Sequence, residues 1–438
     1  MRMLNVSLMA IPIALFALTG CSSGEKPDPK PTDATGGKTG EATGPVSTGC
    51  IKPSDLKYAG AFRLPGGDDE NSWGWGGQAL TYRPDGNPNS ADDGHPGSLF
   101  GTGHAWHQRL SEITIPKPVV SKTKNLDELP TAKTLQPLQN VYGDLYPELE
   151  LPRVGLALLP AQKPQTSSKL YFCRASHMGE GERIPSHGWC ELDLKAPKTA
   201  GAWRIAGADN FTTAHYLFPI PSAWAKQHLD GFCLATGRYR DGGQGSQGPV
   251  IYTLAPWRDG NPPPRQTELK AKALLLYSSV TDEEQHKLKD YHHADEWTAG
   301  AWLTSGDKAA VVFVGTKGEG KCWYGFANGV VWPEEGPWPP VPPAPNDQRG
   351  WWSERFVDQI LFYDPADLAA VAAGKKKPHE PQPYATLGLA PFLFGKKDTY
   401  RRYQTGGMCF DAARGWLYVA EYRGDGDKPL IHVWRVKP

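Results

Sequence analysis

The chain has 438 residues, a length that one all-β domain can reach, so length alone does not fix the number of domains. Aromatic residues make up 11% of the sequence, and glycine (49) and proline (41) are abundant, which favours many short strands joined by turns over long helices. The 47 basic and 47 acidic side chains balance. The net charge therefore indicates neither nucleic acid nor an anionic bilayer as a partner.

The first 21 residues carry the most specific motif of the chain. A short basic start is followed by an apolar run at 4–18, which is shorter than most membrane spans. The run ends in LTGC at 18–21, which resembles the lipobox of bacterial lipoproteins. In that motif small residues admit the signal peptidase, and the cysteine thiol takes a diacylglycerol. A plain signal peptide with a coincidental cysteine is the alternative.

The resemblance implies an exported protein held in the cell envelope by a lipid on Cys21, on the periplasmic or extracellular side. Because Ser22 rather than aspartate follows the cysteine, it also implies the outer membrane if the cell is Gram-negative. Residues 21–49 contain almost no apolar side chains, so we expect a flexible tether between the signal peptide at 1–20 and a folded domain at 50–438.

Six cysteines remain for the folded domain, and export permits disulfides between them. Cys173 and Cys190 flank one predicted hairpin and are the pair that we expect. Buried, unpaired thiols are the alternative. No CxxC motif is present, so the sequence gives no zinc or redox site of that kind.

A unit of four short strands recurs along the domain, which is the pattern of a β-propeller. The final unit lacks its fourth strand, but residues 57–64 (KYAGAFRL) alternate polar and apolar side chains before the first unit. We expect this segment to complete the last blade and close a five-bladed ring, which removes exposed sheet edges. The five units span residues 75–141, 153–205, 213–277, 298–387 and 405–436.

The first strand of each unit carries small residues, such as Gly155 and Gly300, which suits a strand that lines a crowded central channel. Second strands such as AAVVFVGT at 309–316 are apolar on both faces, so neighbouring blades are expected to cover them. A pair of β-sandwiches is the alternative fold, and a sixth blade hidden in 117–150 or 317–358 is a further one.

We expect a site where the loops after second strands and before first strands meet, because both sets surround one mouth of a propeller channel. Every unit contributes cationic or aromatic residues to these loops. At least six of the 12 histidines fall there, namely His104, His107, His177, His215, His292 and His293.

The predicted loop at 317–358 is unusually long and holds aromatic residues around the stretch PWPPVPPAP, among them Trp323, Tyr324, Phe326, Trp332, Trp338, Trp351 and Trp352. Prolines stiffen such a loop and reduce the entropy lost on ordering. Exposed indole faces stack well on sugar rings, whereas a hydrophobic cap over the end of the propeller is the alternative role.

These residue types suit an acidic polysaccharide, because Arg and Lys can neutralise a uronate carboxylate and so acidify the neighbouring C–H. A neutral histidine can then remove that proton while tyrosine protonates the leaving oxygen, which is β-elimination. Secreted propeller lyases are similar in their kinds of site residue, although no motif of one such family is present. The predicted catalytic residues are His104, His177, His215 and Tyr239, and the predicted substrate-binding residues are Arg174, Arg238, Arg402, Trp323, Trp351 and Tyr422.

Three alternatives remain at this point. A glycoside hydrolase needs two carboxylates, for which Glu148, Asp295, Glu296 and Glu421 are available, but the pattern departs from that of the arabinanase type because the first strand of the first unit has no aspartate. A non-catalytic surface binding module or scaffold fits a lipid tether equally well. A metal site could form from His104, His107, His215, and His292 or His293, with Glu296. The sequence names no cofactor, and the predicted partners are a membrane lipid and a glycan.

Overall fold

The computed structural model describes residues 49–87, 94–146, 153–175, 184–208, 210–240, 247–278, 286–395 and 404–437. Cys21, His177, Arg402 and the predicted signal peptide and tether up to residue 48 lie outside these ranges, and so does Glu148. Among the described residues no helix is both long and apolar enough to cross a membrane.

Five small sheets follow one another along the chain and form the blades of a five-bladed β-propeller, as predicted. Blade 1 contains β3 (Leu80–Arg83), β4 (Gly94–Thr102), β5 (Leu110–Pro116) and β6 (Thr134–Gln139). Blade 2 contains β7 (Val154–Leu159), β8 (Lys169–Arg174), β9 (His187–Cys190) and β10 (Ala200–Ile205), with the short β14 (Glu268–Leu269) added in parallel at its outer edge. Blade 3 contains β11 (Tyr216–Pro219), β12 (Leu234–Gly237), β13 (Ile251–Leu254) and β15 (Ala271–Leu275).

The last two blades complete the ring. Blade 4 contains β16 (Glu296–Ser305), β17 (Lys308–Gly325), β18 (Gly350–Tyr363) and β19 (Ala385–Gly388), and β1 (Gly49–Cys50) pairs with the start of β17. Blade 5 contains β20 (Thr405–Asp411), β21 (Trp416–Asp425), β22 (Lys428–Val436) and β2 (Leu56–Arg63). Short helices lie between strands: α2 (Asn210–Thr213), α3 (Ser222–His228), α4 (Pro365–Ala372), η1 (Pro53–Asp55), η2 (Asp69–Asn71), η3 (Leu126–Glu128) and η4 (Pro256–Arg258).

The ring closes through β2, which the sequence predicted. Its register on β22 runs from Leu56 opposite Val436 to Arg63 opposite Leu430. The free edge of β2 is also covered, because Ala61 exchanges backbone hydrogen bonds of 3.0 and 3.1 Å with Val119 in the loop after β5. The second half of the closing strand is therefore paired on both sides, which protects this part of its edge.

A buried chain of hydrogen bonds crosses this closure. The Tyr58 hydroxyl lies 2.9 Å from Nδ1 of His432, and Nε2 of His432 lies 2.8 Å from a Glu421 carboxylate oxygen. Glu421 also accepts backbone N–H bonds from Phe394 (2.9 Å) and Gly395 (2.6 Å). Three neighbouring strands, β2, β22 and β21, are thus tied together by side chains as well as by backbone. Because Glu421 is fully buried and satisfied in this way, it is engaged inside blade 5.

The inner strands pack closely around the channel, as the small residues in these strands predicted. Each contacts the inner strands of both neighbours, in the order β3, β7, β11, β16, β20 and back to β3. A Cβ placed on Gly155 would lie 2.4 Å from the backbone carbon of Tyr216 in the next blade, and one on Gly407 would lie 2.6 Å from backbone atoms of Ala79 and Leu80. Glycine is needed at these positions because backbone atoms of the neighbouring blade occupy the space that a Cβ would fill.

Apolar side chains fill the space between blades. Residues of β17 alternate between two hydrophobic clusters: Val311 and Phe313 pack toward blade 3, whereas Val312 and Val314 pack toward blade 5. The strand is therefore buried on both faces, as predicted for second strands.

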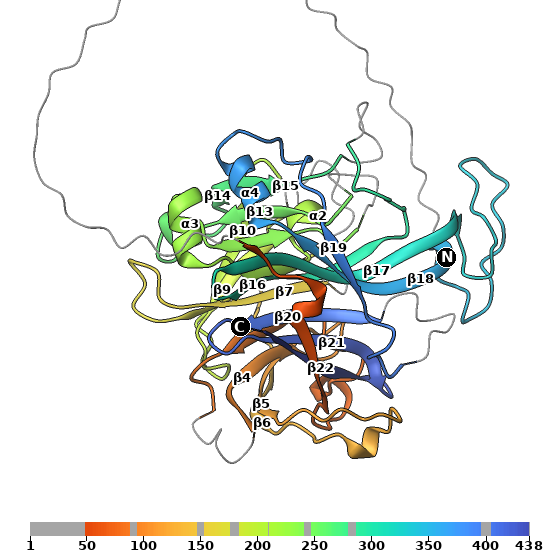
Figure 1. Ribbon diagram of the computed structural model, residues 1–438, viewed down its shortest axis with the longest axis horizontal. Helices are drawn as coiled ribbons and strands as arrows, with labels where there is room; N and C mark the ends of the chain where they lie inside the picture. The colour runs from red at the N-terminus through yellow and green to blue at the C-terminus, as the bar shows by residue number, and fades with distance from the viewer. Residues whose placement is uncertain are drawn as a thin grey trace, which may run out of the picture. The chain divides into compact units, whose positions relative to one another are not determined.

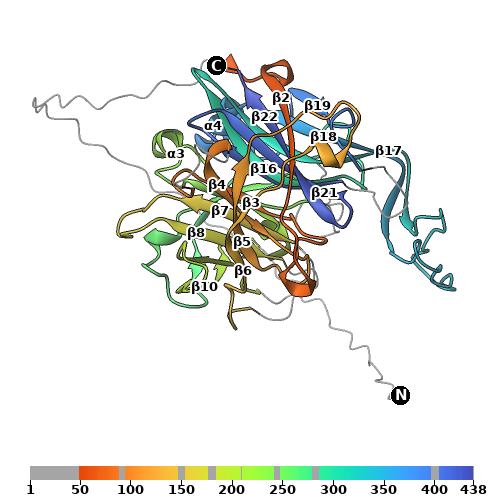
Figure 2. The same cartoon turned by 90° about the horizontal axis from the view of Figure 1, so that it is seen from below.

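Two predictions are corrected by the structure. The segment 317–358 is not a loop throughout, because β17 and β18 continue as a paired hairpin with Gly325 opposite Gly350. This hairpin, here called the arm, extends beyond the body of the propeller (Figures 1 and 2). The expected disulfide is wrong, since Cys173 and Cys190 are free and buried. Cys173 faces His187 and Cys190 faces Leu170 across the β8–β9 pair, which places the two thiols on opposite sides of the blade, in separate clusters.

A glycine substitution at the channel tests this packing. Gly155→Ala should lower the free energy of unfolding by about 1–3 kcal/mol, because the new methyl group meets the backbone of β11. Gly388→Ala is the matched control, since that strand glycine has no atom within 4 Å of the added Cβ, and it should change stability by less than about 0.5 kcal/mol. Urea denaturation of both variants measures the difference, and equal effects would contradict a crowded channel.

Candidate functional site

Buried charged and aromatic side chains converge where the inner strands begin, an end of the channel that we call the upper mouth. Arg153, just before β7, donates from Nη1 to the Tyr422 hydroxyl (3.0 Å), and its Nη2 lies 3.4 Å from Oε2 of Glu296. Nη1 of Arg240 lies 3.5 Å from Oε1 of the same carboxylate. These residues come from blades 2, 5, 4 and 3, so the propeller topology brings them together as predicted for its loops.

The Tyr239 ring lies among these charges. The guanidinium carbon of Arg153 is 4.5 Å from the ring centre and that of Arg240 is 5.1 Å from it. The His215 imidazole contacts the same ring, with centres 4.6 Å apart. Cations over an aromatic face are stabilised by the ring quadrupole, more strongly when they are desolvated. Three of the predicted site residues, His215, Tyr239 and Tyr422, thus belong to the upper mouth, together with Arg153, which the sequence analysis did not single out.

Several buried polar atoms at this same end make no hydrogen bond to any residue that the structure describes. They include the amide atoms of Gln247 on the loop after β12, Oε1 of Gln78 before β3, Nε2 of Gln108 after β4, and Oγ1 of Thr405 at the start of β20. Buried polar groups in folded proteins are normally satisfied by protein, ordered water or ligand.

An open pocket lies beside the upper mouth, at the seam between blades 5 and 1. Its volume is about 500 Å³. The lining comes from the loop that leads from β2 to β3, the loop after β4, and the β21–β22 turn, and we call it the seam pocket. Its residues are Gly67, Glu70, Ser72, Gly74, Trp75, His104, His107, Asp427 and Lys428.

Trp75 is the most unusual residue of the seam pocket. Its φ of 57° lies in the left-handed region, which a bulky side chain rarely adopts. Its N–H donates to the Asp427 carbonyl at 2.7 Å, which holds this backbone in place. The indole is 48% exposed although Arg423 stacks on it at 4.3 Å. Strain of this kind persists only where surrounding structure enforces it, and such strain concentrates at functional sites.

His104 has a defined tautomer in this pocket. The Trp106 N–H donates to its Nδ1 at 3.3 Å, so Nδ1 carries a lone pair and the proton of the neutral ring lies on Nε2. Burial, and then the neighbouring His107, lower the pKa of His104, which keeps the ring neutral at pH 7. His104 can therefore donate a hydrogen bond to a ligand oxygen. The centre of the His107 ring lies 5.0 Å away, and Nδ1 of His107 is 4.0 Å from Glu70.

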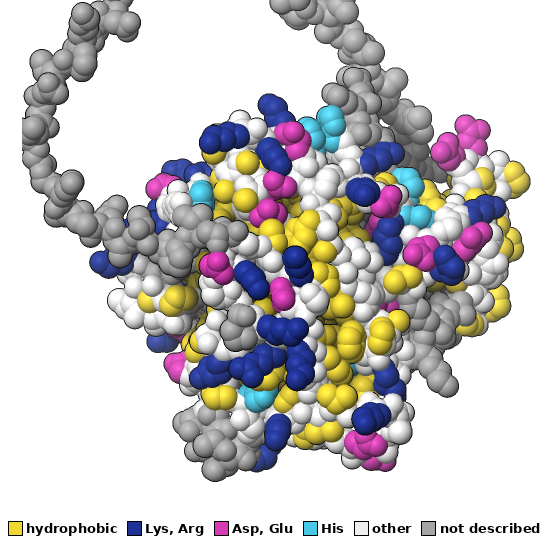
Figure 3. Space-filling model, viewed as in Figure 1, with side chains coloured by type: hydrophobic (Ala, Val, Ile, Leu, Met, Phe, Trp, Pro, Cys, Tyr) yellow, Lys and Arg dark blue, Asp and Glu magenta, His cyan; other side chains and the backbone are white. Residues whose placement is uncertain are grey.

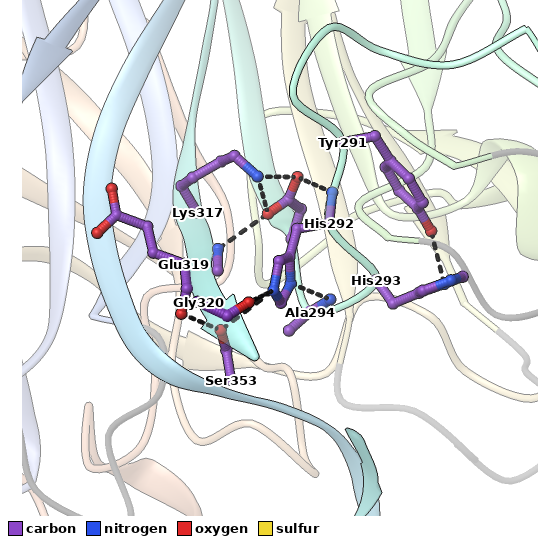
Figure 4. A network of polar contacts seen from close by, with 10 residues as sticks. Tyr291, His292, His293, Ala294, Lys317, Glu319, Gly320 and Ser353 are labelled. Atoms are coloured by element: carbon purple, nitrogen blue, oxygen red, sulfur yellow. Dashed lines mark hydrogen bonds and ion pairs between the residues drawn. The ribbon is translucent and has the colours of Figure 1, made fainter. Parts of the chain in front are cut away.

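A second polar network joins the base of the arm to the loop before β16 (Figure 4). The carboxylate of Asp295 accepts two 3.0 Å bonds from Nζ of Lys317 and further bonds from the backbone N–H groups of Gly318 (2.9 Å) and His292 (3.1 Å). Burial, the largest cause, raises the pKa of Asp295 to about 6, although Lys317 and the N–H donors favour the charged form. The network fixes the loop that carries Glu296 into the upper mouth.

The other predicted residues lie elsewhere. Arg174 donates to Oε1 of Gln108 at 3.2 Å between blades 1 and 2, and Arg238 packs over Phe211 with centres 5.5 Å apart. Trp323 and Trp351 are both on the arm, but the cross-strand pairs Trp323–Trp352 and Tyr324–Trp351 alternate, so the two predicted tryptophans face opposite sides of it. Trp351 stacks on His293 with ring centres 4.4 Å apart. The roles assigned to these residues stay predictions.

The structure does not assemble the alternative metal site, because within the described ranges no three His, Cys, Asp or Glu side chains lie close enough to hold an ion. His104 and His107 belong to the seam pocket, whereas His215 lies at the upper mouth and His292 binds the Gly320 carbonyl at 3.1 Å on the arm. A search of protein-family models finds no match to this chain, and a search of curated proteins finds none either.

Asp295 makes stability depend on pH with a defined sign. Its pKa rises from 3.8 to about 6 on folding, so the folded protein holds the proton more tightly than the unfolded chain between these values. The stability that this group contributes is thus greatest below the lower pKa and declines as the pH rises through the higher one. Relative to Asp295→Asn, which does not titrate, the wild-type protein should lose on the order of 1–3 kcal/mol between pH values of about 4 and 7. Denaturation at both pH values measures it, and a relative gain would show that Lys317 dominates instead.

Proposed function

We propose that this protein binds an acidic polysaccharide on its upper face and that the seam pocket holds one of the sugar units. The exposed, conformationally strained Trp75 is the observation that carries the proposal. Arg423 covers one face of its indole, which leaves the other face for the flat C–H patch of a sugar ring. The indole also lines the pocket, so a ligand there would contact it.

The polar groups of the seam pocket suit a sugar that carries a carboxylate. The Nε2–H of His104 is a donor, and Lys428, whose ammonium pairs with Asp425 at 3.1 Å, lines the same cavity. Glu70 is paired with Arg109, and Asp427 lies 3.7 Å from Arg423, so the acidic groups here have cationic partners. A charged sugar carboxylate would therefore meet Lys428 and a histidine donor without an uncompensated repulsion.

β-Elimination is a second, narrower reading of the same pocket. It requires a cation beside the uronate carboxylate and a base beside the acidic C–H. Because the lone pair on Nδ1 of His104 is engaged by the Trp106 N–H, the free base in the pocket would be His107, with His104 donating to the substrate. Two imidazoles in one open cavity are what favours this reading over hydrolysis by Glu70 and Asp427.

We further propose export and lipid attachment at Cys21, which the LTGC motif supports. The protein would then capture or process glycan at the cell envelope.

Binding to uronate polysaccharides tests the main proposal. Trp75→Ala should raise the dissociation constant about tenfold or more, because the stacking surface is lost from the centre of the site. Trp106→Ala is the matched control, since Trp106 is 54% exposed on the adjoining loop but does not line the pocket. Calorimetric titration of both variants decides between them, and equal losses, or none, would contradict the seam pocket as the binding site.

Product analysis separates the chemistries. If the protein is a lyase, uronate polysaccharide should acquire unsaturated ends with strong ultraviolet absorbance, and His107→Ala should reduce the rate by about 100-fold or more while leaving affinity within about threefold. New reducing ends without that absorbance would point to a hydrolase. Retained binding without any new ends would leave a non-catalytic binding protein.

A further inference from the structure

A row of basic and aromatic side chains crosses the lower rim of blade 5, at the opposite end of the strands from the seam pocket. Lys57 on β2 lies directly opposite Arg435 on β22, and Arg435 lies opposite Trp416 on β21. The Arg435 guanidinium is 5.5 Å from the Trp416 ring centre, and the His95 ring of blade 1 packs on the same indole at 4.4 Å. We call Lys57, Arg435 and Trp416 the basic row.

The basic row carries charge that the protein does not neutralise. Lys57 and Arg435 are exposed, and among the described residues neither takes part in an ion pair. The exposed Lys117 and Arg414 add cations near His95. Arg414 pairs with Asp411 at 3.3 Å, and the Asp411 carboxylate is buried. Figure 3 shows a dense group of Lys and Arg side chains on the face near the C-terminus and β4.

Two like charges directly opposite each other on adjacent strands destabilise a sheet. The Lys57–Arg435 pair therefore lowers the stability of the closing strand. A partner that supplies negative charge would offset this cost. The balanced charge of the whole chain conceals the local excess.

The row lies at the end where the described chain begins. Gly49 pairs with Lys308 at the lower start of β17 in the neighbouring blade, and β2 starts at Leu56, one residue before Lys57.

We infer that the lower rim of blade 5 docks on an anionic phospholipid surface, with Lys57 and Arg435 on the phosphate headgroups and the half-buried Trp416 supporting Arg435. Basic side chains near the surface gain free energy from the negative potential of anionic lipid. The seam pocket would then face away from the bilayer. This inference is independent of the ligand proposed for that pocket.

Vesicle sedimentation tests the inference with residues 44–438, which form a compact unit without the predicted lipid site. The protein should bind vesicles of phosphatidylglycerol and phosphatidylcholine in a ratio of about three to seven, but not vesicles of phosphatidylcholine alone, and salt should weaken the binding. The Lys57→Gln/Arg435→Gln variant should bind about 20- to 30-fold more weakly, since each charge contributes about fivefold. Its melting temperature should equal or exceed that of the wild-type protein, because the like-charge pair is gone.

Lys195→Gln/Lys226→Gln is the matched control, since it removes the same charge from exposed residues at the same end of blades 2 and 3. It should bind as the wild-type protein does. The inference is overturned if the control loses as much affinity as the row variant, if both vesicle types bind equally, or if neither binds.

Discussion

The pairing of β2 with β22 is the constraint on which the rest of the molecule depends. It joins a strand near the start of the domain to its last strand and so places blade 5 against blade 1. Without it, β22 would expose its edge in blade 5, and the cluster that Phe62 and Ile431 share with Leu99 and Ile113 would no longer be held together across blades 5 and 1. The loop at Val119 and the buried chain from Tyr58 through His432 to Glu421 hold the same strand in place from either side.

Closure also creates the candidate site. The segment that leaves β2 supplies Trp75, the loop after β4 supplies His104, and the β21–β22 turn supplies Lys428, so the seam pocket has walls from both ends of the chain. Tyr422 and Arg423 connect it to the channel, because one bonds Arg153 in the upper mouth and the other stacks on Trp75. A substitution that weakens the packing between blades 5 and 1 should therefore perturb the seam pocket more than it perturbs blades 2 and 3.

The two ends of the propeller differ in the chemical groups that they expose. At the upper end, the buried Arg153 and the half-buried Arg240 share Glu296 and flank Tyr239, which places a polar network beside an open aromatic pocket. At the lower end, the exposed pair Lys57 and Arg435 presents cations on a sheet surface. Strand direction separates these features, since the basic row lies where β2 begins and β22 ends, whereas the seam pocket lies beyond the end of β2 and at the start of β22. If both proposals hold, glycan and membrane lie on opposite sides of the propeller.

Periodic features of the sequence predicted much of the fold, whereas features that depend on distant contacts did not appear in it. The alternation in 57–64 predicted the closing strand, and Gly155 predicted the crowded channel. The arm was missed because its prolines and tryptophans resemble a loop, although Tyr324 and Trp351 pair across two continuing strands. Arg153 was missed because its role depends on Tyr422, 269 residues away. His104, Tyr239 and Tyr422, which the sequence placed at or after second strands, lie in the seam pocket or the upper mouth, and their roles stay predictions. The strained backbone of Trp75 has no signature in the sequence except the glycines around it.

Hydrogen exchange of the backbone amides tests ring closure most directly. If β2 closes the ring, the amides of Leu56–Arg63 that bond to β22 should be as protected as those of Lys428–Val436, and both should exchange together in one global opening. Rapid exchange across Leu56–Arg63 while the inner strands stay protected would show that the ring is open at this seam, and the pocket built on it would have no basis.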